Sequence, residues 1–226
     1  SRTMPFVSKV TGNQIIKAGT LLMLGHTLDS VKKNTSYLNS STEKIAIKKA
    51  IFPWSRFPAE DTMLGPEMKA TGEVLGIGKS FGVALNKAYA AAGVEINKDK
   101  KGIFVSLSDQ EKSNFISVVK TYANLGFQIY STEGTGKYLK NHSIDSIIVG
   151  RAEETSPTSL TILQENLISL VINTPTFANE YTDGWKIRRL SHETGVAVVS
   201  SVREAEAFLK AFNEISKSFE DMEAIQ

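Results

Sequence analysis

The sequence predicts an α/β protein whose C-terminal part is a parallel five-stranded sheet between layers of helices. From residue 98 onward, short runs of β-branched and apolar residues alternate regularly with helix-like segments. Such alternation is typical of parallel strands joined by helices that cover both faces of the sheet. The chain has 226 residues, 41% of them hydrophobic, which is enough to bury a substantial core.

Residues 1–97 lack this regularity and are predicted to be the end of a larger domain followed by a helical linker. We expect an apolar helix at 15–24, a strand at 44–52 and a helix at 80–92. Stretches rich in Asn, Ser, Thr, Pro and Gly separate these elements. Because the sequence begins without Met, we interpret it as a piece of a longer or processed protein.

The region 98–226 is predicted to form one domain, in which each strand is followed by a helix. Ser108 and Glu111 form a capping-box pattern at the start of its first helix. The acidic segment 214–223 of its last helix is interpreted as a solvated face. Strands are expected at 103–107, 127–131, 146–149, 169–172 and 197–200, and helices at 109–125, 137–141, 160–165, 185–193 and 202–219.

The stretch 127–136, with the sequence FQIYSTEGTG, is the strongest candidate for a binding site. A strand runs into two glycines interleaved with Thr132 and Thr135, and a helix follows. Glycine lets the backbone approach a ligand closely, and amides at a helix start can bind an anion. The alternative is a tight turn in which the hydroxyl groups serve only as caps.

Small polar or charged residues also end the other predicted strands. In an open parallel sheet, ligands bind beyond the carboxyl ends of the strands, so these side chains are expected to converge. We therefore predict a pocket for a phosphorylated metabolite at this edge of the sheet. The residues concerned are Ser106, Ser108, Lys112, Thr132, Thr135, Arg151, Asn173 and Thr174.

Composition argues against several other classes of function. The 26 basic and 24 acidic residues are well mixed, so nothing indicates nucleic-acid binding. Without cysteines, the chain has no disulfides or thiolate metal sites, which fits a reducing compartment. Its apolar runs are far shorter than the ~20 residues that span a bilayer. We expect a cytoplasmic protein without a membrane or metal site.

Two further patterns are set aside. The run 76–80 (GIGKS) resembles a P-loop, but the first glycine is displaced by one position, at Gly72, and no clear strand precedes the run. We interpret it as a glycine-rich start of a helix. The histidines His26, His142 and His192 lie in separate segments and lack the spacing of metal ligands.

Three stretches resemble the C-terminal end of the large chain of carbamoyl phosphate synthetase. They are 1–12 (SRTMPFVSKVTG), 52–76 (FPWSRFPAEDTMLGPEMKATGEVLG) and the whole of 102–226. The resemblance implies that 1–97 is the remnant of the second ATP-grasp half with its linker. It implies that 98–226 is a three-layer, methylglyoxal-synthase-like allosteric domain.

In that family the full large chain makes carbamoyl phosphate with ATP, Mg²⁺ or Mn²⁺ and K⁺, for arginine or pyrimidine synthesis. A glutaminase small chain supplies the ammonia. Arg2 matches the last arginine of the catalytic ATP-grasp motif, whereas the nucleotide and metal ligands lie upstream. The resemblance therefore implies that this chain alone is not catalytic and holds no cofactor. It also implies a partner small chain, the rest of the large chain, and an oligomer formed through the C-terminal domain.

The resemblance implies that the predicted pocket binds a nucleotide effector such as UMP or IMP. The matching positions are Ser106, Lys112, Thr132, Glu133, Gly134, Thr135, Arg151, Asn173 and Thr174, with Arg151 in place of a lysine. The planar guanidinium and the compact ammonium are not equivalent at a phosphate site. Residues 176–180 (TFANE) also depart from the glycine and basic residues of many relatives.

Other family functions match this sequence less well. Some relatives bind ornithine between the two domains, and the matching positions here are Lys49, Val198 and Ser200, so we expect weak or lost ornithine activation. Methylglyoxal synthases use an aspartate in a GPxGGD run, which is missing between residues 140 and 165. Our leading hypothesis is a regulatory module. The alternatives are a structural or oligomerisation module and, less favoured, a lyase.

Overall fold

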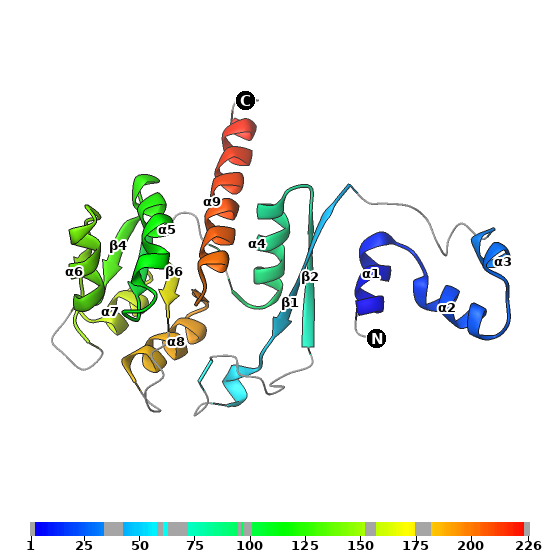
Figure 1. The fold of residues 1–226 in the computed structure, drawn as a ribbon, viewed down its shortest axis with the longest axis horizontal. Helices are drawn as coiled ribbons and strands as arrows, with labels where there is room; N and C mark the ends of the chain where they lie inside the picture. Colours follow the sequence, from blue (N-terminus) through cyan, green and yellow to red (C-terminus); the bar gives the residue numbers. More distant parts are fainter. Residues whose placement is uncertain are drawn as a thin grey trace.

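The structure is a computed structural model that describes residues 3–33, 43–57, 61–62, 72–94, 96, 101–151, 157–174 and 182–223. Three helices begin the described chain: α1 (Thr3–Thr11), α2 (Ile15–Met23) and α3 (Leu28–Lys32). Figure 1 shows them on the far side of a two-stranded ribbon from the five-stranded sheet. Only α2 matches an element predicted from the sequence.

The two-stranded ribbon consists of β1 (Ile45–Ile51) and β2 (Gly72–Gly78), which pair antiparallel. The strand β2 was not predicted, and it includes the first glycines of the P-loop-like run. Helix α4 (Phe81–Ala91) follows, with the Ser80 hydroxyl accepting a hydrogen bond from the N–H of Val83. The run 76–80 therefore contains the end of β2 and the N-cap of α4. The predicted glycine-rich start of a helix is confirmed, but the expectation that no strand leads into the run is wrong.

The second sheet is parallel throughout and has five strands, as the sequence predicted. It contains β3 (Gly102–Ser106), β4 (Gln128–Ser131), β5 (Ile147–Ile148), β6 (Ile168–Asn173) and β7 (Ala197–Val199), in the order β5-β4-β3-β6-β7. The strand β3 is central, and the chain moves outward from it in both directions. Such a reversal of strand order is the usual place for a ligand crevice.

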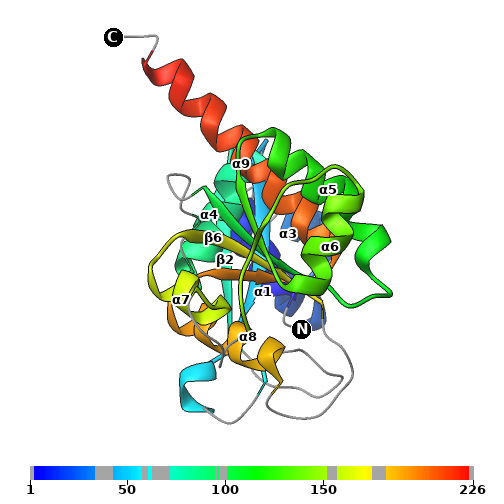
Figure 2. The same ribbon diagram turned by 90° about the vertical axis from the view of Figure 1, so that its left-hand side faces the viewer.

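Helices cover both faces of this sheet and complete three layers (Figure 2). One hydrophobic core packs helices α5 (Lys112–Asn124), α6 (Glu133–Asn141) and α9 (Val202–Glu223) against one face, and α4, which packs on β2 and α9, contributes Leu85 to it. A smaller core packs α7 (Ser159–Gln164) and α8 (Asp183–Glu193) against the other. Leu85 of α4 lies in the same core as Phe115 of α5, so the predicted boundary near residue 97 separates elements that share a core.

Some predicted helix starts are wrong. The helix α5 begins at Lys112, where Glu111 makes no side-chain cap; instead the N–H of Glu111 donates to the carbonyl of Ser108 in a turn. The capping-box prediction therefore fails. The helix α6 begins at Glu133, four positions before the predicted start, so Gly134 and Gly136 lie inside a helix.

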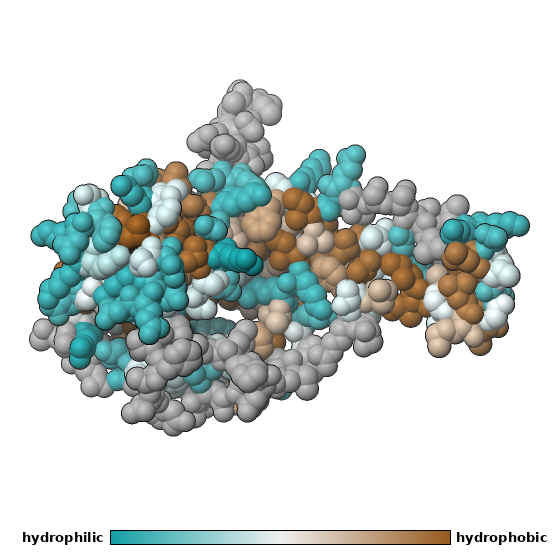
Figure 3. Space-filling model, in the orientation of Figure 1, coloured by the Kyte–Doolittle hydropathy of each residue, from teal (hydrophilic) through white to brown (hydrophobic). Residues whose placement is uncertain are grey.

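The surface differs between the two ends of the molecule. Hydrophilic side chains dominate the visible face of the domain built on the parallel sheet, whereas hydrophobic residues gather along the N-terminal helices (Figure 3). Met23 is 90% exposed and Leu24 is 74% exposed. Within the described residues, no helix combines the length and the apolar character needed to cross a bilayer.

Candidate functional site

A cavity of about 390 Å³ lies at the carboxyl ends of the strands, around the reversal of strand order. It extends from the first turn of α6 to the first turn of α8. The residues that line it are Ser106, Leu107, Ser108, Thr132, Glu133, Gly134, Val149, Arg151, Asn173, Thr174, Thr182, Asp183, Gly184 and Arg188. We call it the strand-end cavity.

Most residues of the predicted pocket do meet in this cavity. Lining positions are held by Ser106, Ser108, Thr132, Gly134, Arg151, Asn173 and Thr174. Lys112 and Thr135 are not among the lining residues. Arg2 and the variant loop 176–180 lie outside the described residues.

Thr135 has a supporting place behind the cavity wall. It is 1% exposed, and its hydroxyl accepts hydrogen bonds from the N–H of Leu107 at 3.0 Å and from the Thr132 hydroxyl at 3.2 Å. Thr132 is the N-cap of α6, but its side chain does not cap the helix. The two threonines therefore join the loop after β3 to the start of α6. The positive end of the α6 dipole faces the cavity at Gly134.

A second set of hydrogen bonds fixes the loops after β3 and β6. The Thr174 hydroxyl accepts from the N–H of Ser108 at 2.7 Å and lies 3.4 Å from the Ser108 hydroxyl. The Thr174 N–H and the Asn173 side-chain amide both donate to the carbonyl of Ser106. These contacts make a preorganised wall, in which several predicted ligand hydroxyls already have protein partners.

Lys112 lies beside the cavity, next to the first turn of α6. A Cβ atom placed on Gly134 would be 3.7 Å from the Lys112 Nζ. That Nζ forms a 2.6 Å ion pair with Asp109, whose side chain is 92% exposed. The hydrogen bond from Lys112 lowers the pKa of Asp109. The Lys112 Nζ is thus near enough to contact an anion at Gly134 if it releases the solvent-exposed carboxylate of Asp109.

The sequence reasoning missed the first turn of α8, which forms the opposite wall. The Thr182 hydroxyl caps this helix by accepting from the N–H of Trp185 at 3.3 Å, and Asp183 and Gly184 follow in the first turn. A threonine N-cap before an acidic first turn is a recognisable helix-start signal. The strand-end cavity therefore lies between the N-termini of two helices.

Arg188 of α8 is a further lining residue that sequence reasoning missed. It is buried, and its guanidinium donates to the Asn173 side-chain oxygen at 2.6 Å and to both carboxylate oxygens of Asp61. Nothing in the sequence near position 188 indicates this role, because the partners are 127 and 15 residues away.

The charges around the cavity are mixed. Arg151 and Arg188 contribute cations, and Glu133 and Asp183 contribute carboxylates. Glu133 forms an exposed 2.7 Å ion pair with Lys137, and Lys137, followed by the weaker effect of Arg151, lowers the pKa of Glu133. The arrangement suits a ligand that carries both an anionic group and hydrogen-bond donors.

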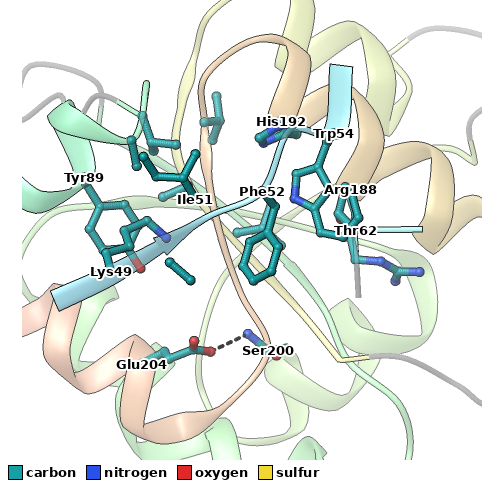
Figure 4. Close-up of a pocket in the computed structure, with 16 residues that line it drawn as sticks. Lys49, Ile51, Phe52, Trp54, Thr62, Tyr89, Arg188, His192, Ser200 and Glu204 are labelled. Carbon is teal, nitrogen blue, oxygen red and sulfur yellow. Dashed lines mark hydrogen bonds between the residues drawn. The ribbon is translucent and has the colours of Figure 1, made fainter. Parts of the chain in front are cut away.

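A second cavity, of about 260 Å³, lies between β1, α4, α8 and the start of α9 (Figure 4). It brings together Lys49, Val198 and Ser200, the three positions compared above with ornithine binding. The Lys49 Nζ lies over the Tyr89 ring, 4.2 Å from its centroid. Burial lowers the pKa of Lys49, and the charge of Glu204 opposes that shift.

The chain is similar to proteins of known family. A family model described as the MGS-like domain matches residues 114–200. The carbamoyl phosphate synthase large chain, C-terminal section, of Aquifex aeolicus is 36% identical over 234 residues, which cover 98% of this chain and 43% of that protein. The C-terminal section from Methanocaldococcus jannaschii is 35% identical, over 95% of this chain and 36% of that protein. The carbamoyl phosphate synthase large chain of Synechocystis sp. is 35% identical, over 100% of this chain and 21% of that protein.

These similarities agree with the architecture described above. The five-stranded parallel sheet with helices on both faces is consistent with an MGS-like domain. The chain spans less than half the length of each of these relatives. The resemblance seen in the sequence is therefore confirmed: this chain corresponds to the C-terminal region of the carbamoyl phosphate synthase large chain and contains an MGS-like domain.

Proposed function

We propose that the strand-end cavity binds a phosphorylated effector, such as UMP or IMP, and that this chain is the regulatory end of a carbamoyl phosphate synthase. The observation that supports the proposal most directly is the position of two helix N-termini and two guanidinium groups around one cavity. Helix N-termini and arginine forks both favour phosphate groups.

The lining of the cavity suits the different parts of a nucleotide. The phosphate fits between the two helix N-termini, where the dipole at Gly134 acts together with Arg151, Arg188 and, at the edge, Lys112. The carboxylates of Glu133 and Asp183 offer oxygen acceptors for ribose hydroxyls or base N–H groups. Inorganic phosphate would lie near the two carboxylates of the lining, Glu133 and Asp183, but has no ribose or base whose N–H and O–H groups could donate to them. We therefore favour a nucleotide over an inorganic anion.

The rest of the proposal concerns the complete enzyme. It is a ligase that makes carbamoyl phosphate from ATP, bicarbonate and glutamine in the cytoplasm, for arginine or pyrimidine synthesis. Residues 1–97 are the remnant of the second ATP-grasp half, and the ATP, Mg²⁺ or Mn²⁺ and K⁺ sites belong to the rest of the large chain. A glutaminase small chain is the partner, and this chain alone does not catalyse the reaction.

Calorimetric titration with UMP and with IMP tests the effector site. Wild type is expected to bind at least one of them, and Arg151→Ala is expected to weaken binding about tenfold to a hundredfold, because one charge-assisted contact is worth about 1.5–3 kcal/mol. Lys140→Ala, at the exposed end of α6 away from the cavity, is the control and should bind as wild type does. Absence of binding at millimolar nucleotide would refute the effector role.

A structural module remains the second candidate. The internal hydrogen bonds of Thr135 and Thr174, together with the balanced charges of the cavity, favour it, because a preformed wall can hold the loops without a ligand. Removing residues 98–226 from the complete enzyme separates the two functions. A structural module predicts lost oligomer assembly with an unchanged response to nucleotides. An effector domain predicts that the response disappears.

A further inference from the structure

Arg188 connects the strand-end cavity to the N-terminal part of the chain. One edge of its guanidinium, Nε and one terminal nitrogen, donates to the two carboxylate oxygens of Asp61. The other terminal nitrogen, Nη1, donates to the Asn173 side chain at 2.6 Å. A single buried cation is therefore shared between a strand end of the cavity and a residue 127 positions earlier in the sequence.

The edge of Arg188 that binds Asn173 is the edge closest to the cavity. A Cβ atom placed on Gly184, in the first turn of α8, would be 3.0 Å from Nη1, so this nitrogen lies directly against a lining residue. The stem of Arg188 also borders the second cavity, but Figure 4 shows the guanidinium pointing away from it. An anion near Asn173 and Gly184 would come within reach of Nη1.

The next arginine of α8 holds the same N-terminal segment. The Nη1 of Arg189 donates to the carbonyls of Trp54 at 2.9 Å and Phe57 at 3.0 Å. Consecutive arginines therefore attach residues 54–57 and Asp61 to the helix whose first turn forms the cavity wall. A change in the charge balance at Arg188 acts directly on its contact with Asp61, and residues 54–57, held by the neighbouring Arg189, lie shortly before Asp61 in the chain.

We propose that Arg188 is a further anion-binding residue of the strand-end cavity and that Asp61 competes with the bound anion for it. Binding of the effector would then weaken the Arg188–Asp61 ion pair and loosen residues 54–57 from α8. This inference rests on the proposed function, because it names how occupancy of that same cavity reaches the N-terminal part of the chain.

Burial and charge indicate that Asp61, and not Arg188, gives way when an anion binds. The Arg188 side chain is 7% exposed, whereas that of Asp61 is 35% exposed. Two anions beside one guanidinium repel each other strongly where water is scarce. The carboxylate of Asp61 is the more exposed partner and lies nearer to solvent, whereas the buried arginine cannot follow it without leaving Asn173. By thermodynamic reciprocity, removing the charge of Asp61 must then raise the affinity for the anion.

Titration of the Asp61→Asn chain with UMP and with IMP tests this competition. The variant keeps the size of the side chain and one acceptor oxygen but removes the charge. We expect it to bind the nucleotide at least about fivefold more tightly than wild type does. Glu73→Gln on β2 is the matched control: its carboxylate pairs with Lys48 at 2.6 Å, is 32% exposed, and lines neither cavity. The control should bind as wild type does.

Hydrogen exchange provides the second measurement. The N–H groups of Arg56 and Phe57 donate to the carbonyls of Pro53 and Trp54, so they are protected while this segment is held. Saturating wild type with the nucleotide should speed their exchange, and Asp61→Asn alone should do the same without nucleotide. Unchanged exchange of the β3 and β6 amides in the variant would establish that its sheet remains folded.

The outcomes separate the two proposals. Nucleotide binding by wild type with unchanged or weaker binding by Asp61→Asn would overturn the competition and leave the effector site standing. Binding without faster exchange at Arg56 and Phe57 would overturn the link to the N-terminal part. If neither wild type nor Asp61→Asn binds UMP or IMP, both proposals are wrong.

Discussion

The carboxylate of Glu214 on α9 accepts a hydrogen bond from the backbone N–H of Gly82 in the first turn of α4, at 2.6 Å. The acid thus caps a helix from another part of the chain, and the sequence interpretation of 214–223 as a solvated face is wrong at this residue. A Cβ atom on Gly82 would come within 3.0 Å of the Ala211 carbonyl oxygen. The contact joins the N-terminal part to the domain built on the parallel sheet.

Replacing Glu214 with alanine is expected to destabilise the protein by about 1–2 kcal/mol, because a helix amide loses a charged cap. The free energy of unfolding from urea denaturation measures the effect. Glu206→Ala, on an exposed position of the same helix, is the control and should change stability by less than about 0.5 kcal/mol. Equal effects of the two substitutions would show that the cap contributes nothing.

Gly76→Ala is expected to destabilise the chain by about 3 kcal/mol or more, because overpacking against backbone cannot relax easily. Its Cβ would lie 2.0 Å from the Ala84 carbonyl oxygen and 2.6 Å from the Ala88 N. Urea denaturation again provides the measurement. Gly19→Ala is the control, since nothing beyond the adjoining backbone of α2 lies within 4 Å of the added Cβ, and it should stabilise by about 0.5–1 kcal/mol. A tolerated Gly76→Ala would contradict the close packing of α4 on β2.

His192 is expected to make the protein less stable as the pH falls below about 6.5, its ordinary pKa. Burial, and next the charge of Arg189, lower its pKa in the folded state, although Glu193 opposes them. The unfolded chain therefore takes up a proton at a higher pH than the folded chain, and stability decreases until the pH reaches the folded pKa.

Unfolding free energies measured between pH 7 and pH 5 check this expectation. The carboxylates with a lowered pKa, Asp109 and Glu133, change the stability only at lower pH, so this range isolates the histidine. His192→Gln should flatten the dependence in this range, whereas His26→Gln, at an exposed position, should leave it as it is. An equally steep dependence in His192→Gln would assign the effect to other groups.

Ornithine is expected not to bind detectably at millimolar concentration, because the positive charge of Lys49 lies in the cavity that would receive it. Lys49→Glu should bind ornithine more tightly than wild type, since it replaces a like charge with an opposite one. Calorimetry measures both, and Lys49→Met is the control that removes the cation without adding an acid. Ornithine binding by wild type would contradict the prediction.

Much of the parallel-sheet domain could be predicted because its signals are local. Alternating buried runs and amphipathic stripes placed all five strands and their helices in the right order, and the strand order then brought their carboxyl ends together. The boundaries were less accurate. The start of α6 was placed too late because Gly134 and Gly136 were interpreted as a loop, whereas Gly136 is helical and lies close to Ser131 and Ile148 of the neighbouring strands.

The first ninety residues were predicted less well for a physical reason. The strand β2 is rich in glycine because α4 packs directly on its backbone, so it lacks the β-branched pattern that marks a strand. The helices α1 and α3 are short, and neither their capping nor their periodicity was distinctive enough to predict them.

The sequence by itself determined the α/β class, the set of polar residues at the strand ends and the resemblance to a synthetase C-terminus. These depend on residue type and spacing along the chain. Only the tertiary structure placed Thr135 behind the cavity wall and joined Arg188 to Asp61 and Asn173. A hydrogen bond between residues 127 positions apart depends on how the layers pack, and no local periodicity encodes that distance.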